Sequence, residues 1–299
     1  MTPEQVRRLV TDVLGETPLA VSHLAFGHNS VSFDVALKDR SLIVRTNADP
    51  KVFAKTSANL AALRELGLPV SEVVTSDLTK TRRPFAYMIL EKIPGRDLRD
   101  ELGAMTPSQK ERLAEQIVGF QRRVAASPPG QGFGYAPIGE TARFASWPEL
   151  VVSEIRKDLP AALEPPLASL TNRVFSLTDA FTPHLEKVPP TCFLDDLTIK
   201  NVIVRGGELQ GLVDFDVVCY GDPLWTLGLT AAAIVADLSA EHLDYVGALC
   251  NAYGLDETAR RVVDLYAALF ALTFWARGTP EQKVRLRHAL EAWLEPLER

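Results

Sequence analysis

The sequence has 299 residues, a formal net charge of −6, 46% hydrophobic residues and 23% charged residues. A chain of this length can bury a large core and commonly forms two lobes or domains. The negative charge argues against a nucleic acid or an anionic membrane as partner, and three scattered cysteines exclude a disulfide framework or a zinc site. The first residues are polar and no apolar run reaches the ~20 residues that span a bilayer, so we expect a reduced, cytoplasmic location.

The first 94 residues are predicted to form a helix followed by a small antiparallel sheet. Thr2 and Gln5 give a capping box at the start of the helix, and short apolar runs separated by turn residues then indicate a meander. A second helix precedes the last two strands. The expected elements are a helix at 3–15, strands at 20–26, 31–37 and 41–45, a helix at 51–66, and strands at 72–75 and 85–90.

From residue 95 onward the chain is predicted to be mostly helical. Thr106 and Gln109 repeat the capping signature, and a Pro/Gly-rich loop at 128–139 interrupts the helical pattern. The expected helices cover residues 106–126, 147–159, 167–185, 224–236, 241–252, 257–277 and 280–294.

A hairpin is predicted within residues 190–223. Gly206-Gly207 lies between two short apolar runs, and a tight turn there needs positive φ. In that register Asn201 lies opposite Leu212 and on the same face as Asp214, with a diagonal separation of about 7 Å. The pairing therefore predicts that Asn201 and Asp214 lie within reach of a shared ion.

The same segment provides a third oxygen donor. Asp196 precedes Asn201 by five positions, on the loop that enters the hairpin. Two carboxylates and an amide oxygen are ligands that Mg²⁺ accepts, usually alongside phosphate oxygens. A polar loop with no ligand would give the same bare spacing.

The order Asp196-x-x-x-x-Asn201, hairpin, Asp214 resembles the catalytic and metal-binding segment of the aminoglycoside phosphotransferase family, which is kinase-like and related to choline and macrolide kinases. Gly221-Asp222-Pro223 also resembles the usual continuation in that family, where the Asp is commonly structural. The resemblance implies an α+β, protein-kinase-like, two-lobed fold. Residues 1–94 would form a small N-lobe with an antiparallel sheet, and residues 95–299 a larger, mostly helical C-lobe.

The resemblance also implies roles for individual residues. Asp196 would be the catalytic base, and Asn201 and Asp214 would be the metal ligands. Arg45 stands where a kinase-like strand places its phosphate-binding Lys, and arginine can bind phosphate through its planar fork. A charged residue at a strand end would look the same.

Two backbone segments complete the implied nucleotide site. The turn with Gly27, Asn29 and Ser30 would cover the nucleotide phosphates, and backbone groups from Glu91 to Ile93 would form the hinge that hydrogen-bonds a purine edge. An ordinary hairpin turn and a simple loop after a buried strand are the alternatives for these two segments.

The sequence departs from the family pattern at several positions. Thr56 stands near the place of the helix Glu that pairs with the strand Lys, and Glu65 and Glu72 are the candidate replacements. Leu194-Asp195 replaces the usual His-Gly before Asp196, which places a second carboxylate beside the first.

Two further positions also differ in a way that bears on the site. Asp216 would share a face with Asp214 if the strand continued, as an additional metal ligand or as a residue behind the ligands. Thr226 stands where relatives often have Asp, which bears on local hydrogen bonding.

The resemblance implies a small-molecule kinase that transfers the γ-phosphoryl group of ATP or GTP to a hydroxyl, with Mg²⁺ and without a nucleic-acid or membrane partner. A nucleotide- or small-molecule-binding protein without transfer is the main alternative, favoured by the departures at Thr56 and Leu194. A metal-dependent hydrolase is a weaker one, because no Ser, Cys or His nucleophile constellation accompanies the carboxylates. An aminoglycoside, a macrolide, a sugar and an amino alcohol all remain open as acceptors, because fold does not fix function.

Overall fold

The computed structural model describes residues 1–24 and 30–298. The chain divides into two compact units, one of Met1–Pro94 with Gly211–Val217 and one of Gly95–Gln210 with Val218–Arg299. The short segment Gly211–Val217 thus belongs with the N-terminal residues, although it follows them by more than a hundred positions. None of the helices in the described ranges combines the length and the apolar character needed to cross a membrane.

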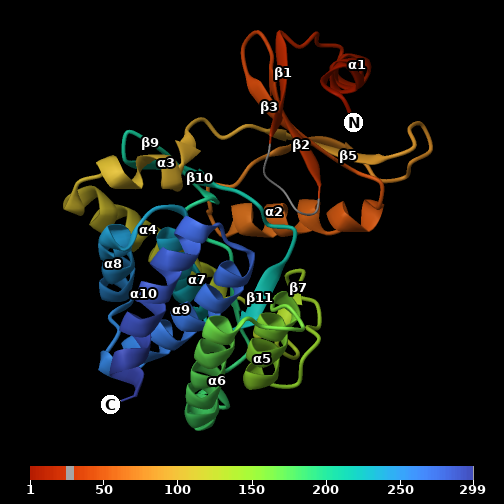
Figure 1. Ribbon diagram of the computed structural model, residues 1–299. Coiled ribbons are helices and arrows are strands. Elements are labelled where there is room, and N and C mark those ends of the chain that lie inside the picture. Colours follow the sequence, from red (N-terminus) through yellow and green to blue (C-terminus); the bar gives the residue numbers. More distant parts are fainter. Residues whose placement is uncertain (25–29, 299) are drawn as a thin grey trace. The chain divides into compact units, whose positions relative to one another are not determined.

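An antiparallel sheet forms the centre of the first unit. Its five strands, as far as this unit is described, have the order β1-β2-β3-β5-β4, and α1 packs beside β1 (Figure 1). The Thr2–Gln5 capping box that the sequence predicts is present at the start of α1. The elements are α1 (Pro3–Leu14), β1 (Ala20–Leu24), β2 (Val31–Ala36), β3 (Ser41–Asn47), η1 (Pro50–Phe53), α2 (Thr56–Glu65), β4 (Val73–Asp77) and β5 (Ala86–Glu91).

The core of this unit lies between α1 and the sheet. Val6 and Leu9 on α1 pack with Phe33, Val44 and Ile89 from three strands, and all five side chains are fully buried. β3 lies between β2 and β5, so Arg45 stands on a central strand whose backbone is held on both sides. The backbone at Arg45 is therefore held in place, which helps to position a side chain that binds a ligand.

The second unit is mostly helical, and the helices that the sequence predicts are all present (Figure 1). The helices and 3₁₀ turns of this unit are α3 (Leu98–Glu101), η2 (Leu102–Ala104), α4 (Pro107–Ala125), α5 (Trp147–Asp158), α6 (Pro165–Leu185), α7 (Leu224–Asp237), η3 (Ala240–Leu243), α8 (Asp244–Tyr253), α9 (Glu257–Arg277) and α10 (Pro280–Leu297). The sequence did not predict α3, nor the short strands β6 (Arg96–Asp97), β7 (Gly134–Ala136), β8 (Thr191–Phe193) and β11 (Val218–Gly221).

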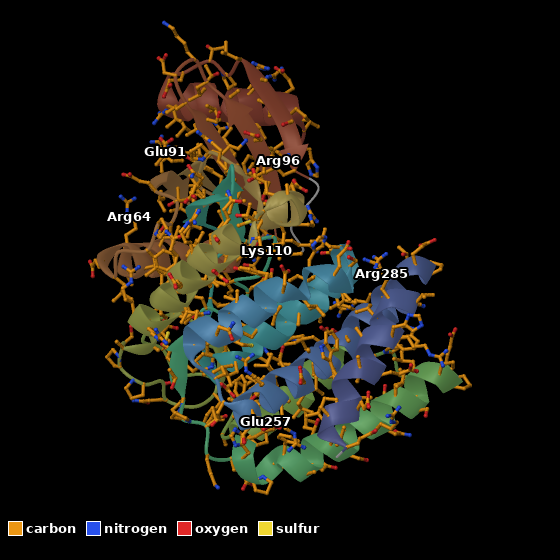
Figure 2. All side chains as sticks on the ribbon, turned by 90° about the vertical axis from the view of Figure 1, so that its left-hand side faces the viewer. Arg64, Glu91, Arg96, Lys110, Glu257 and Arg285 are labelled. Atoms are coloured by element: carbon orange, nitrogen blue, oxygen red, sulfur yellow. The ribbon has the colours of Figure 1, made fainter. Side chains whose placement is uncertain are left out.

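Helix α7 forms the apolar centre of the second unit. It packs against α9 and α10, and Arg285 of α10 donates hydrogen bonds to the carbonyl oxygens of Val235 and Ala236 at the end of α7, at 3.0 and 2.6 Å (Figure 2). These carbonyls lack partners inside their own helix, and a cation is favoured beside them. A buried aromatic cluster of Trp147, Trp225 and Tyr266 joins α5, α7 and α9.

The predicted hairpin is present between β9 (Val202–Arg205) and β10 (Glu208–Leu212). Gly206 and Gly207 have φ values of 60° and 77°, as a tight primed turn requires. The strand ends at Leu212, however, and Asp214 has a φ of 70°. The alternation of side chains between the two faces of a strand therefore stops before Asp214. The prediction that Asp214 shares a face with Asn201 depended on that alternation.

The close contact between α7 and α9 gives a stability prediction. A Cβ added at Gly228 would lie 2.4 Å from Tyr266 Cβ and 2.7 Å from the backbone nitrogen of Ala267. We expect Gly228→Ala to lower the free energy of unfolding, because overpacking costs about 1–3 kcal/mol and exceeds the roughly 1 kcal/mol gain in helix propensity. Chemical denaturation followed by circular dichroism measures the change.

Gly247→Ala is the matched control, since a Cβ at this helical position of α8 meets nothing within 4 Å. This variant should be as stable as the parent or more stable. Equal stability of the two variants would contradict the close contact at Gly228.

Candidate active site

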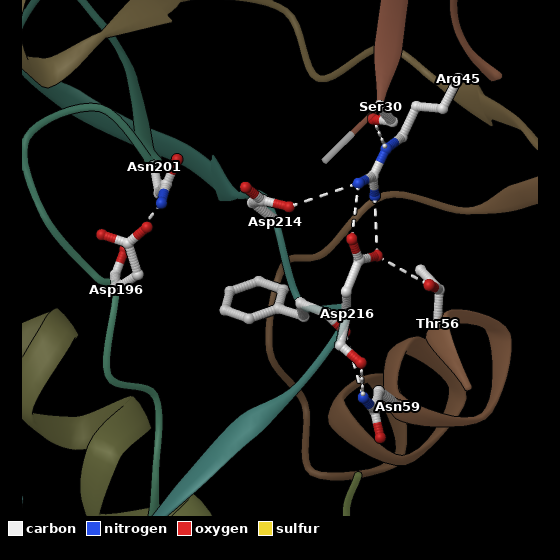
Figure 3. A network of polar contacts seen from close by, with 9 residues as sticks. Ser30, Arg45, Thr56, Asn59, Asp196, Asn201, Asp214 and Asp216 are labelled. Atoms are coloured by element: carbon white, nitrogen blue, oxygen red, sulfur yellow. Dashed lines mark hydrogen bonds and ion pairs between the residues drawn. The ribbon is translucent and has the colours of Figure 1, made fainter. Parts of the chain in front are cut away.

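Arg45 in the first unit is held by a carboxylate and a hydroxyl. Its two terminal nitrogens donate to the two carboxylate oxygens of Asp216 at 2.9 and 2.6 Å, and its Nε donates to Ser30 Oγ at 3.3 Å (Figure 3). The guanidinium lies 5.3 Å from the centre of the Phe53 ring. Burial acts to lower the pKa of Arg45, but the hydrogen bonds and charge of Asp216, with a contribution from Asp214, outweigh it and raise the pKa. Arg45 is therefore a fixed, permanently charged fork.

Helix α2 holds Asp216 in turn. Thr56 Oγ1 donates to Asp216 Oδ1 at 2.7 Å, and Asn59 Nδ2 donates to the carbonyl oxygens of Phe215 and Asp216 at 3.2 and 2.8 Å (Figure 3). Thr56 and Asn59 are three positions apart and so share one helix face, and both are almost fully buried. Since buried polar groups need partners, the pair fixes both the side chain and the backbone at residue 216.

This arrangement corrects one expectation. The acidic partner of Arg45 is Asp216, whereas Glu72 pairs with Arg64 at 3.2 Å and Glu65 is exposed. Asp216 therefore holds Arg45, and its role as an additional metal ligand or as a residue behind the ligands stays a prediction. Thr56 and Asn59, two polar residues on the buried face of the helix predicted at 51–66, were the sequence signal that could have indicated a polar partner for this helix.

Asp214 lies next to this network with its carboxylate directed away from the helix contacts. Its backbone is in the left-handed region, where Asp is tolerated better than most residues, and the buried Phe215 follows it. Its side chain is 54% exposed, and Oδ1 lies 3.6 Å from an Arg45 nitrogen. Partial burial raises the pKa of Asp214, and the charge of Arg45 opposes this rise. An accessible carboxylate of this kind suits a hard cation such as Mg²⁺.

The predicted hinge residues follow β5 within the first unit. The Glu91 N–H donates to the Glu72 carbonyl at 2.9 Å, the Lys92 N–H donates to the Ser41 carbonyl at 3.0 Å, and the Glu91 side chain binds Arg40. Among the three predicted residues, the Ile93 N–H is thus the donor that makes no backbone bond within the described part of the chain. The predicted phosphate-covering residues Gly27 and Asn29 lie outside the described residues.

The predicted base and amide lie on one loop of the second unit. Asn201 Nδ2 donates to the Asp196 carbonyl at 2.8 Å (Figure 3). The Asn201 N–H donates to the Thr198 carbonyl at 3.1 Å. Because the amide nitrogen is engaged, the amide oxygen is the side-chain atom of Asn201 that could bind a cation. The Asp196 carboxylate is exposed and accepts a bond from Thr198 Oγ1 at 3.2 Å.

Two residues outside the motif anchor this loop. The Gln121 side chain on α4 donates to the Leu194 carbonyl at 2.7 Å and accepts from the Leu194 N–H at 2.9 Å. Thr226 Oγ1 on α7 donates to the same carbonyl at 2.9 Å. The buried Leu194 thus holds the loop through its backbone, where similar kinases have a His. Sequence reasoning flagged Thr226 but missed Gln121.

Asp195 and Asp222 have different surroundings from Asp196. Burial raises the pKa values of Tyr135 and Cys219, and the charge of Asp195 adds to both, which places Asp195 near β7 and β11. Asp222 accepts from the Tyr266 hydroxyl at 2.8 Å and from the Leu224 N–H at 3.0 Å, so its role is structural, as the resemblance implies.

The structure thus assembles two local constellations, with Arg45, Ser30 and Asp214 in the first unit and Asp196 and Asn201 in the second. Over residues 1–24 and 30–298, no group of three or more His, Cys, Asp and Glu side chains could hold a metal. A cation bound at either constellation would therefore also need amide, water or phosphate oxygens, as is usual for Mg²⁺.

A small antiparallel sheet with a basic central strand, joined to a helical unit with an Asp-x4-Asn loop, defines a kinase-like protein. The chain belongs to the phosphotransferase enzyme family, whose model matches residues 24–266. The family resemblance, the two-lobed α+β fold class and the enzyme class predicted from the sequence are therefore confirmed. A search of curated proteins found no match.

Solved structures agree on the fold at low sequence identity. Aminoglycoside phosphotransferase APH(4)-Ia is similar with a TM-score of 0.70 and 13% identity, covering 98% of each chain. A thermostable mutant of it in ternary complex with AMP-PNP and hygromycin B has a TM-score of 0.65 and 14% identity, covering 97% of each chain. A GDP and kanamycin complex of a second aminoglycoside phosphotransferase has a TM-score of 0.69 and 16% identity, covering 99% of this chain and 98% of that one.

The anchoring of the loop by Gln121 gives a second prediction. Gln121→Leu leaves the buried Leu194 N–H without its partner, so we expect the free energy of unfolding to fall by about 1–3 kcal/mol. Chemical denaturation measures it. Gln131→Leu, at an exposed position of the same unit, is the control and should leave the stability nearly unchanged. If both variants unfold alike, the anchor contributes nothing.

Proposed function

We propose that this protein is a Mg²⁺-dependent small-molecule kinase that transfers the γ-phosphoryl group of ATP or GTP to a hydroxyl. The membership of the phosphotransferase family carries the proposal, because the match includes every residue of both local constellations. Phosphoryl transfer needs positioning and charge neutralisation more than covalent catalysis, and the described networks supply rigid charged groups.

The first unit would bind the nucleotide. Arg45 retains N–H groups beyond those that bind Asp216 and Ser30, because a guanidinium has five donors in total. These remaining donors would contact the α- or β-phosphate. The Ile93 N–H and neighbouring carbonyls would meet the purine edge, and the turn with Gly27, Asn29 and Ser30 would cover the phosphates.

The metal would bind to Asp214 and to the amide oxygen of Asn201. The donor set fits Mg²⁺, because Asp214 offers an accessible carboxylate and the Asn201 amide has its nitrogen already engaged. When bound, Mg²⁺ supplies charge neutralisation between the phosphates. Before any ligand arrives, the Asn201 side chain is held by its bond to the Asp196 carbonyl, and the backbone next to Asp214 is held by Asn59.

The second unit would bind the acceptor. Asp196 would take the proton of the acceptor hydroxyl, and the hydroxyl oxygen would bond to the γ-phosphorus. The bond between the γ-phosphorus and the β-γ bridging oxygen would break, which releases the nucleoside diphosphate. Asp196 suits this role better than Asp195, since its carboxylate is exposed and its backbone is tied to Asn201.

Other proteins with the same fold suggest which acceptors to test. Solved structures with the same fold contain hygromycin B or kanamycin with AMP-PNP or GDP. Aminoglycosides, macrolides, sugars and amino alcohols are therefore the compounds to test first, each with ATP and with GTP. A nucleotide-binding protein without transfer is the second candidate, favoured by the departures from the family pattern at Thr56 and Leu194. Mass-spectrometric detection of a phosphorylated compound supports the kinase, whereas nucleotide binding without any phosphorylated product supports the second candidate.

Asp196→Asn tests the base. We expect turnover to fall by about 10²–10⁴-fold, because the variant has no group to accept the hydroxyl proton, while nucleotide affinity stays close to that of the parent. Turnover from a coupled assay and affinity from calorimetry are the two measurements. Asp256→Asn, at the N-cap of α9, is a control for carboxylate loss in the same unit. Unchanged turnover in Asp196→Asn would reject the assignment.

Asp214→Asn tests the metal ligand. We expect the Mg²⁺-dependent part of nucleotide binding to weaken by roughly tenfold or more, because an amide neutralises no charge on the cation. Thermal shift with nucleotide, with and without Mg²⁺, measures the effect. A normal Mg²⁺-dependent shift in this variant would show that the metal binds elsewhere.

A further inference from the structure

Arg45 has two carboxylates within reach, and only one of them holds it. An Arg45 terminal nitrogen lies 2.6 Å from Asp216 Oδ2 and 3.6 Å from Asp214 Oδ1. Both terminal nitrogens bind Asp216 in a bidentate pair, which is the stronger and more directional form of this interaction. Asp214 interacts with the fork through a longer ion pair of 3.6 Å, beyond hydrogen-bond distance (Figure 3).

The two carboxylates also differ in exposure and support. Side-chain exposure is 11% for Arg45 and 18% for Asp216, but 54% for Asp214. Thr56 and Asn59 fix Asp216 through its carboxylate and its carbonyl. Asp216, the more buried carboxylate, therefore binds Arg45, and Asp214 is the carboxylate that is more accessible to a ligand.

We propose that Asp216 is a positioning residue that keeps Arg45 from forming a close bidentate pair with Asp214, so that the Asp214 carboxylate stays accessible to a divalent cation. Without the charge of Asp216, the nearest acid to the fork is Asp214. The present 3.6 Å ion pair would then shorten to a close Arg45–Asp214 pair that competes directly with the cation. Thr56 and Asn59 support this role by holding Asp216 against α2. The inference rests on the proposed nucleotide and Mg²⁺ binding at Arg45 and Asp214.

The decisive experiment measures the Mg²⁺ concentration that half-saturates nucleotide binding, by calorimetry with AMP-PNP and with GDP. This readout requires no turnover. For Asp216→Asn we expect the half-saturating concentration to rise on the order of tenfold, because Mg²⁺ must displace Arg45 from Asp214. Thr56→Val, which keeps the charge but removes one bond to Asp216, should give a smaller rise in the same direction.

A second-site variant separates this mechanism from a general loss of structure. In Arg45→Met combined with Asp216→Asn, no guanidinium is present to occupy Asp214, so the half-saturating Mg²⁺ concentration should return close to that of the parent. The nucleotide affinity of this double variant at saturating Mg²⁺ should remain below that of the parent protein, because the contact between Arg45 and the phosphate is lost. Asp12→Asn is the matched control, since it removes an exposed carboxylate paired with Arg83 in the same unit.

Each outcome has a distinct meaning. A rise in Asp216→Asn that persists in the double variant would overturn the inference, since Asp216 would then act on the cation itself or through the fold. An unchanged Mg²⁺ requirement in both Asp216→Asn and Thr56→Val, with normal binding by the parent protein, would overturn the inference and leave the proposed function standing. Failure of the parent protein to bind either nucleotide at any Mg²⁺ concentration would overturn both.

Discussion

The bidentate ion pair between Arg45 and Asp216 is the interaction on which the first constellation depends. Both side chains are mostly removed from water, where an unpaired charge is costly, so neither could keep its place without the other. A buried ion pair is weak evidence for stability, but here it fixes direction, because a planar fork on a carboxylate permits little rotation. The position of Asp214 follows from the same pair, since the two acids flank a single buried aromatic residue, Phe215.

The fold explains how these residues come to share one unit. Arg45 lies on the central part of a sheet built from local strand pairs, whereas Gly211–Val217 joins that unit from far along the chain. The segment is held there by contacts that are not those of a regular strand: the Leu212 N–H donates to the Pro69 carbonyl at 2.9 Å, and Asn59 binds the carbonyls that follow Asp214. A left-handed backbone at Asp214 is the consequence, because the chain must turn between the strand end and the helix that receives it.

The sequence predicted those features that arise from local pattern. Helix caps at Thr2 and Thr106, the glycine turn at 206–207 and the buried strand before Glu91 all depend on neighbouring residues, and the structure has them. The strands β6, β7, β8 and β11 escaped prediction, because two to four residues carry too little periodicity. The partner of Arg45 escaped for another reason, since a pair 171 positions apart leaves only an indirect signal, the polar Thr56 and Asn59 on the buried face of α2. Gln121 was missed likewise, because a polar residue on an otherwise amphipathic helix gives no indication of which backbone it binds.

The departures from the family pattern can be understood through the same physics. A missing acid on α2 does not leave Arg45 unpaired, because Thr56 is small enough to admit Asp216 and its hydroxyl then holds that carboxylate. In the second unit, Leu194 supplies only backbone groups, and Gln121 and Thr226 satisfy them from two helices, so the loop that carries Asp196 needs no imidazole to be ordered. In both places the chemical group that is absent from the motif position is replaced by one from elsewhere in the chain. Both the candidate base and the candidate metal ligand thus have local support in this chain although the motif itself has changed, so the departures alone do not argue for loss of activity.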